Sequence, residues 1–262
     1  MGLEYDGSGF AGWQTQAGVP SVQAALEAAL STVADEPVSV IIAGRTDAGV
    51  HGAGQVAHFD TTAVRSARGW TLGANAHLPD TVSVCWARVV PRHFHARYSA
   101  ESRTYRYFIL NRLGRSALNA GRMTLIHKPL DAAAMARAAQ FLPGEHDFSA
   151  FRAAECQARS PVRRLHCLNV WREGEGVVIE ATANAFLHHM VRNLAGLLIA
   201  VGLGKARPEW AREVLESRDR RQAAPTAPPD GLYFWQVRYP AAFAIPGPPA
   251  AVSAIMTPPP SA

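Results

Sequence analysis

The chain has 262 residues, 48% of them hydrophobic and 18% charged, which is typical of a globular protein that buries one large core or two moderate ones. The sequence shows no secretory leader and no apolar run near the ~18 residues of a membrane span. Its three cysteines include no CxxC pair, so we expect neither disulfides nor a cysteine-based zinc site. Together these features favour a cytoplasmic protein without a membrane span. The net charge of +5 divides into −4 over residues 1–90, +8 over 91–170 and +1 over 171–262. Of the 26 basic residues 24 are arginines, and a basic segment of this kind indicates a polyanionic partner, although a GC-rich genome would also favour arginine.

The first 95 residues predict the order strand, helix, strand, strand, helix, strand. The expected segments are a strand at 1–6, a helix after the Ser21 cap, strands at 38–43 and 55–59, a helix near 70–76 and a strand at 82–90. Apolar residues recur at helical spacing after Ser21, and Ser is a preferred N-cap. This order predicts a split βαβ unit and hence an α+β fold.

Residues 96–240 repeat this plan. The expected segments are a strand at 103–111, a helix at 132–142 between Asp131 and Pro143-Gly144, strands at 165–171 and 177–182, helices at 185–201 and 208–217, and a strand at 232–237. We therefore predict an N-terminal catalytic half at 1–95 and a C-terminal half at 96–240. Residues 241–262 are rich in proline and alanine without periodicity, and we expect this tail to be disordered.

Residues 44–50, the signature loop, form a glycine-rich connection that carries an unusual density of reactive side chains. Asp47 follows Arg45 by two residues, and a carboxylate beside a guanidinium stays ionised and can act as a nucleophile or a base. The alternative is that Asp47 only caps a turn.

Other kinds of site have less support. The histidine pairs at 93/95 and 188/189 do not have the spacing of helical zinc ligands, and no dinucleotide or P-loop motif is present, so we expect neither a metal nor a nucleotide cofactor. A carboxylate-dependent hydrolase would need a second well-placed carboxylate, and none is evident.

Two basic regions could contact RNA, and a third arginine lies in an apolar helix. Tyr105 and Tyr107 face the same side of a strand that also carries Arg103 and Arg106, so they are either one edge of a core or a base-stacking surface beside phosphate-binding arginines. A second region contains Arg152, Arg159, Arg163 and Arg164 and is either a solvated face or an RNA contact. Arg192 lies in an apolar helical stripe and needs an acidic partner, for which Asp47 is a candidate.

Seven motifs together make the chain resemble the TruA-type tRNA pseudouridine synthases from Leu3 to Tyr239. They are Tyr5-Asp6-Gly7 with Gly12-Trp13-Gln14, Gly44-Arg45-Thr46-Asp47-Ala48-Gly49-Val50-His51, Phe94-His95-Ala96-Arg97, Arg103-Thr104-Tyr105-Arg106-Tyr107, residues 148–161, residues 185–193 and Gly231-Leu232-Tyr233. The first strand of the family normally begins earlier, and the sequence leaves open whether the natural start lies upstream of Met1.

The resemblance implies two ferredoxin-like halves joined into a mainly antiparallel sheet flanked by helices, with the active-site cleft between the halves. It implies an isomerase that converts uridine to pseudouridine in the anticodon stem and loop of tRNA, at positions 38, 39 and 40, without cofactor or metal. It also implies a homodimer. The alternative is a catalytically inactive RNA-binding module of the same fold.

The resemblance also assigns roles to residues. Asp47 corresponds to the nucleophile, Arg192 to its charge partner, Tyr105 to the tyrosine stacked on the target base, and Arg45 to the arginine that occupies the space of the flipped nucleotide. Arg103, Arg152 and Arg163 are expected RNA contacts. Whether Asp47 attacks C1′, adds to C6 or abstracts a ribose proton is left open by the sequence.

Overall fold

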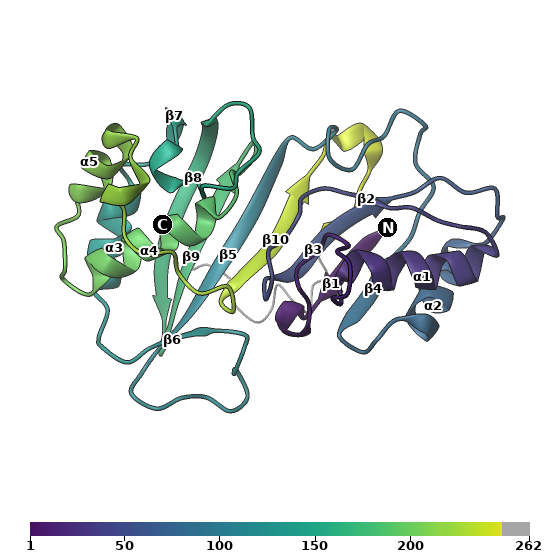
Figure 1. Ribbon diagram of the computed structural model, residues 1–262, viewed down its shortest axis with the longest axis horizontal. Helices are drawn as coiled ribbons and strands as arrows, with labels where there is room; N and C mark the ends of the chain where they lie inside the picture. The colour runs from purple at the N-terminus through teal and green to yellow at the C-terminus, as the bar shows by residue number, and fades with distance from the viewer. Residues whose placement is uncertain (248–262) are drawn as a thin grey trace. The chain divides into compact units, whose positions relative to one another are not determined.

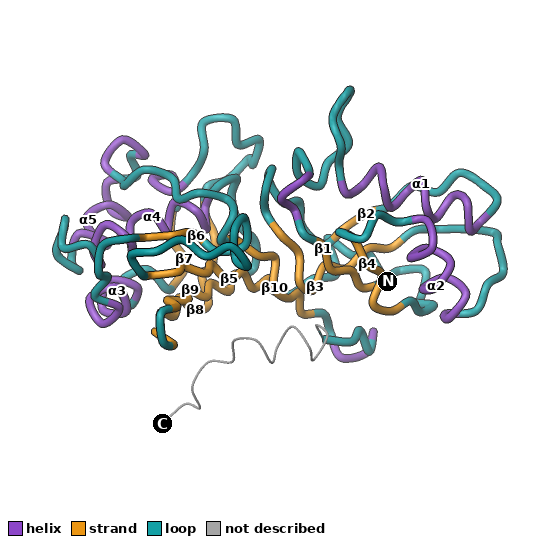
Figure 2. The backbone as a smooth tube through the Cα atoms, turned by 90° about the horizontal axis from the view of Figure 1, so that it is seen from below, coloured by secondary structure: helices purple, strands orange, loops and turns teal. Residues whose placement is uncertain are grey.

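The computed structural model describes residues 1–247, which fold into two compact units (Figure 1). Unit 1 contains Met1–Arg103 and the segment that begins at Tyr233, and unit 2 contains Thr104–Leu232. In each unit the strands form one layer and helices pack against it (Figure 2). The predicted α+β class is therefore confirmed.

Unit 1 has a four-stranded sheet in the order β4-β1-β3-β10, with the short strand β2 paired to β3. Its elements are β1 (Gly2–Tyr5), α1 (Val22–Ala34), β2 (Ile41–Ile42), β3 (His51–His58), α2 (Ala67–His77), β4 (Val82–Trp86) and β10 (Leu232–Arg238). The β1–β3, β1–β4 and β2–β3 pairs are antiparallel, whereas β3 and β10 run parallel. Both helices share one core with β1 and β4, which includes Trp13, Leu26, Leu30 and Trp70.

Unit 2 has a sheet in the order β5-β9-β8-β7, with β6 paired to β5. Its elements are β5 (Ser102–Asn111), β6 (Thr124–Ile126), α3 (Ala132–Ala139), β7 (Gly144–Asp147), β8 (Val162–Glu173), β9 (Gly176–Ala183), α4 (Met190–Gly202) and α5 (Trp210–Ser217). Strands β8 and β9 form a long antiparallel hairpin, and Gly174 makes its turn with a φ of 56°.

Several predicted boundaries in unit 1 are wrong. The strand expected at 38–43 is reduced to Ile41–Ile42, because the amides of Val38 and Val40 bond to the Ser31 and Glu27 side chains of α1 instead of a neighbouring strand. Strand β3 begins at His51 rather than at residue 55, since its first residues pair with β1 and β10. Strand β4 ends at Trp86, opposite Gly2, where its partner strand begins.

The helix expected at 185–201 begins only at Met190. His189, the residue before it, has a φ of 60°, and this left-handed conformation interrupts a right-handed helix. Phe186 therefore lies in the irregular segment before α4 and not on its apolar stripe. The helix expected at 132–142 ends at Ala139, after which the Phe141 amide bonds three residues back to Ala138.

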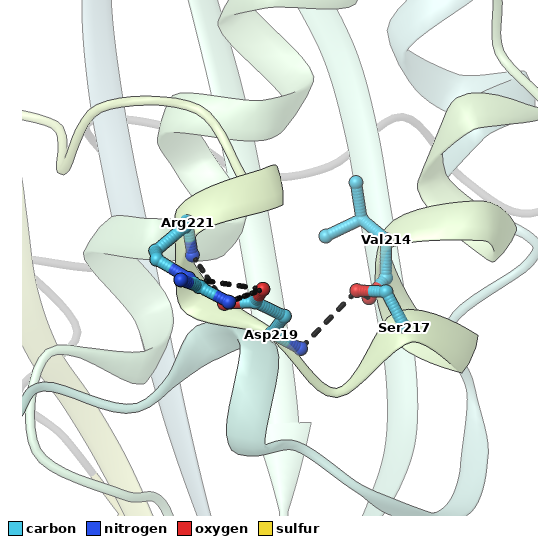
Figure 3. A network of polar contacts seen from close by, with 4 residues as sticks. All are labelled: Val214, Ser217, Asp219 and Arg221. Atoms are coloured by element: carbon cyan, nitrogen blue, oxygen red, sulfur yellow. Dashed lines mark hydrogen bonds and ion pairs between the residues drawn. The ribbon is translucent and has the colours of Figure 1, made fainter.

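Helix α5 ends in a compact polar arrangement (Figure 3). The Ser217 hydroxyl donates to the Val214 carbonyl at 2.7 Å and accepts the Asp219 amide at 3.2 Å. Asp219 then accepts hydrogen bonds from the backbone and guanidinium of Arg221. These bonds satisfy groups that the end of a helix leaves without partners.

Two findings concern the remaining predictions. Among residues 1–247, no helix has the length and apolar character needed to cross a membrane. In the tail that we expected to be disordered, Ala241–Phe243 form a short 3-10 turn, and residues 248–262 lie outside the described part of the chain.

Candidate active site

The signature loop joins β2 to β3, and hydrogen bonds hold its backbone on both sides of Asp47. The Trp13 amide donates to the Thr46 carbonyl at 3.0 Å, and the Val50 amide donates to the Asp47 carbonyl at 3.1 Å. The Asp47 residue is half-buried. Because the neighbouring carbonyls are already bonded, the carboxylate projects from a backbone of defined conformation.

The side chain of Thr46 is also held in place. Its hydroxyl lies 2.9 Å from the Tyr5 hydroxyl, and both residues are buried. Burial raises the pKa of Tyr5 to about 12, so the phenol keeps its proton. Gly12 packs on the other side with a φ of 99°, and a Cβ there would lie 2.7 Å from the Thr46 carbonyl oxygen. This position therefore requires glycine.

The beginning of the loop is held by two polar side chains. The Gln55 amide donates to the Gly44 carbonyl at 2.8 Å. The Arg103 guanidinium donates to the Ala43 carbonyl through Nε at 3.3 Å and through Nη2 at 3.1 Å. Arg45 is exposed. The structure thus gives Arg103 a supporting role for the loop that the sequence did not indicate.

His51 directly follows the signature loop as the first residue of β3, and it joins three of the sequence motifs. It is 1% exposed, and its Nδ1 accepts the Gly7 amide at 3.1 Å while its ring stacks on Tyr233 at 4.5 Å. The Asp6 carboxylate also lies 3.3 Å from Nδ1, so the buried ring contacts both the Asp6–Gly7 segment and Tyr233.

In unit 2 the two tyrosines of β5 have different surroundings. Tyr107 is fully buried, and its hydroxyl lies 2.6 Å from the Thr124 hydroxyl and 2.9 Å from the Pro228 carbonyl, which it bonds as a donor. Tyr107 is therefore a core residue, as the first alternative proposed. Tyr105 is 9% exposed, and its ring makes an edge-on contact with Phe186 at 5.0 Å.

Arg192 lies in the first turn of α4 and is half-buried. Its Nε donates to the Ala227 carbonyl at 2.9 Å, and the Ala227 amide donates to the Arg192 carbonyl at 3.1 Å. The next residue, Asn193, is 1% exposed and donates to the Phe151 carbonyl at 2.7 Å. The first turn of α4 is thereby fixed to two separate segments of unit 2.

The arginines of the second basic region bond to nearby carbonyls. Arg152 donates to the Cys156 carbonyl. Arg163 donates to the carbonyls of Ser160 at 2.9 Å and Val162 at 2.6 Å. Both guanidinium groups therefore have defined positions, that of Arg152 just after η2 (Ser149–Phe151) and that of Arg163 near the start of β8.

Cys156 organises the same connection, which its sequence context did not reveal. The thiol is buried and accepts the His188 amide at 3.4 Å, so it joins this segment to the turn before α4. Burial raises its pKa, but the Ala158 and His188 amides and the Arg152 guanidinium lower it, and the net pKa lies below the usual range.

The predicted site residues are thus divided between the units. In unit 1, Arg45 and Asp47 lie on the signature loop, and Arg103 bonds to Ala43 directly before it. Unit 2 contains Tyr105, Arg152, Arg163 and Arg192. The residues that support the loop were not predicted to do so. The sequence could have indicated a supporting role for the residues that lie in its motifs, which are Tyr5, Trp13, His51 and Tyr233. Gln55 gives no such signal, because it is only one position of an alternating strand.

Comparison with known proteins gives consistent matches along the chain. A family model described as tRNA pseudouridine synthase matches residues 3–99 and 138–240, two stretches that include Asp47 and Arg192. The tRNA pseudouridine synthase A of Methylococcus capsulatus is 59% identical over 245 residues, which cover 94% of this chain and 90% of the relative. Those of Nitrosococcus oceani and Pseudomonas aeruginosa are both 56% identical, covering 94% of this chain and 95% and 87% of the relatives.

Proposed function

Because this chain belongs to the tRNA pseudouridine synthase family, we propose that it is an isomerase that converts uridine to pseudouridine in the anticodon stem and loop of tRNA, at positions 38, 39 and 40. The reaction breaks the C1′–N1 bond, turns the detached uracil and joins C1′ to C5. The proton on C5 is released to water, and N1 gains one.

Asp47 is the nucleophile of this reaction. The observation that carries the proposal is the backbone of the signature loop, held by the Trp13 and Val50 amides on either side of Asp47. A carboxylate on a fixed backbone needs little reorganisation when the target nucleotide arrives. The buried Tyr5–Thr46 pair supports the same assignment, because it fixes the residue directly before Asp47.

The other predicted residues bind the substrate. Tyr105 stacks on the target base, and Arg192 is the charge partner of Asp47. Arg45, which is exposed, enters the space that the flipped nucleotide leaves. Flipping a base costs a few kcal/mol, and phosphate contacts offset this cost.

The remaining proposals concern partners and location. Arg103, Arg152 and Arg163 add positive charge that attracts tRNA phosphates, and all three lie in the segment of charge +8. In line with its family, the protein acts as a homodimer in the cytoplasm, without metal or cofactor.

The deciding experiment is tritium release from tRNA labelled at C5 of uridine. We expect wild type to release tritium, and Asp47→Asn to lose several orders of magnitude in rate while binding tRNA with unchanged affinity. Asp80→Asn is the matched control, since Asp80 is an exposed turn residue of the same unit, and it should keep full activity.

The outcomes separate the rival functions. Normal turnover by Asp47→Asn would refute the nucleophile assignment. Tight tRNA binding by wild type without tritium release would identify an inactive RNA-binding module. Cleavage of the RNA chain on a denaturing gel would instead indicate a hydrolase.

A further inference from the structure

A turn in unit 1 exposes an aromatic ring beside positive charge. Tyr98 follows β4 in the chain and is 76% exposed. The His95 ring stacks against it at a centroid distance of 4.3 Å and an interplanar angle of 30°. The Arg97 guanidinium lies 5.5 Å from the centre of the Tyr98 ring. Arg92, His93 and Arg97, which belong to the same basic segment of the chain, are also exposed.

This turn is held by specific hydrogen bonds. The Nδ1 atom of His95 accepts the amides of Arg97 and Tyr98, both at 3.1 Å. The His95 amide donates to the Ser99 hydroxyl at 3.0 Å, and the Ser99 amide donates back to the His95 carbonyl at 2.9 Å. An exposed aromatic ring on a rigid turn loses less conformational entropy on binding than one on a mobile loop.

The same turn is connected to the signature loop. The Arg103 guanidinium donates to the carbonyl of Arg97 as well as to the carbonyl of Ala43, which directly precedes the loop. The Ala96 amide donates to Nδ1 of His58 on β3, and the Tyr239 hydroxyl donates to the Ala96 carbonyl at 2.6 Å. Tyr98 and the loop that carries Asp47 are therefore supported by one shared guanidinium.

We propose that Tyr98, together with Arg97, is a second nucleobase-binding site that stacks an unpaired base of the tRNA substrate outside the catalytic pocket. The inference rests on the proposed function. Base stacking on aromatic rings is tolerant of sequence, and a nearby arginine adds cation–π attraction or a phosphate contact. A single exposed apolar residue would need no explanation. An aromatic ring that is stacked on a histidine, carried by a hydrogen-bonded turn and set in a basic segment is suited to a nucleotide, whose base is planar and whose phosphate is negatively charged.

The test measures the affinity of the full-length protein for fluorescein-labelled tRNA. Tyr98→Ala should weaken binding by about 5- to 150-fold, the range that one base stack provides, and should raise KM for tRNA accordingly. Tyr98→Phe keeps the ring and should bind within about twofold of wild type. Val89→Ala is the control, because Val89 is 94% exposed in the same unit and should behave as wild type.

A second RNA distinguishes stacking from charge. Tyr98→Ala should bind a duplex RNA without unpaired bases as wild type does, since a paired base offers no face to the ring. Unchanged tRNA affinity, equal loss in Tyr98→Phe, or equal loss on duplex RNA would each overturn the proposal. If wild type binds tRNA through Tyr98 but releases no tritium, the proposed function fails and this site stands. If wild type releases tritium while Tyr98→Ala binds tRNA with wild-type affinity, the second site is refuted and the proposed function stands.

Discussion

Removing the Tyr5 hydroxyl should weaken both the fold and the support of Asp47. In Tyr5→Phe the buried Thr46 hydroxyl loses a partner at 2.9 Å, and an unsatisfied buried hydroxyl costs about 1–3 kcal/mol. We expect the free energy of unfolding in urea to fall by this amount, with a lower kcat because Thr46 directly precedes Asp47. In the double variant with Thr46→Val, both hydroxyls are absent, so the loss should be smaller than the sum of the two single losses.

The pKa of Tyr5 tests a separate property of the same residue, its burial, which raises this pKa whereas the hydrogen bond with Thr46 lowers it. The pKa rises from 10.0 to about 12 on folding, so the stability it reports is fully present below pH 10 and is lost as the pH rises toward 12. At pH 11 the unfolded phenol is mostly ionised and the native one is not, which costs wild type about 1.4 kcal/mol. Tyr5→Phe lacks this loss.

Unfolding in urea at pH 8 and pH 11 tests the reasoning. The stability difference between wild type and Tyr5→Phe should shrink by about 1.4 kcal/mol at the higher pH. Burial also raises the pKa values of Tyr107 and Tyr239, but both proteins share these residues and their effects cancel. A difference that stays constant with pH would show that Tyr5 is not protected from ionisation.

Two further substitutions test the packing around the proposed site. Gly12→Ala should lower the free energy of unfolding and kcat together, because its Cβ overlaps the Thr46 carbonyl. Gly18→Ala is the control: Gly18 has a similar positive φ of 77° with open space around it, so this variant should lose only about 1–2 kcal/mol in urea and keep full tritium release. Equal effects of the two substitutions would refute the overlap. Tyr107→Phe should lose about 1–3 kcal/mol of stability, because the tyrosine hydroxyl that it removes bonds to Thr124 and Pro228. The variant should bind tRNA as wild type does, and weakened tRNA binding in the fluorescence assay would instead favour a role in stacking.

Local sequence patterns determined much of this protein. The Ser21 cap, the alternating strands and the order of segments predicted the α+β class, because capping and side-chain alternation are properties of neighbouring residues. The signature loop and the resemblance it carries led to the family to which the chain belongs. Those motifs name Asp47, Tyr105 and Arg192, but they do not say what supports them.

Only the tertiary structure decided how the loop is held and which polar residues are structural. The amides of Val38 and Val40 bond to side chains of α1 and not to a neighbouring strand. Helix α4 begins later than expected because His189 adopts a left-handed conformation. Arg103 reads in the sequence as one more basic residue, yet its guanidinium bonds carbonyls that belong to positions 43 and 97. The bond to Ala43 joins residues 60 positions apart in the chain, and no local sequence pattern encodes a partner that only folding brings within hydrogen-bond distance.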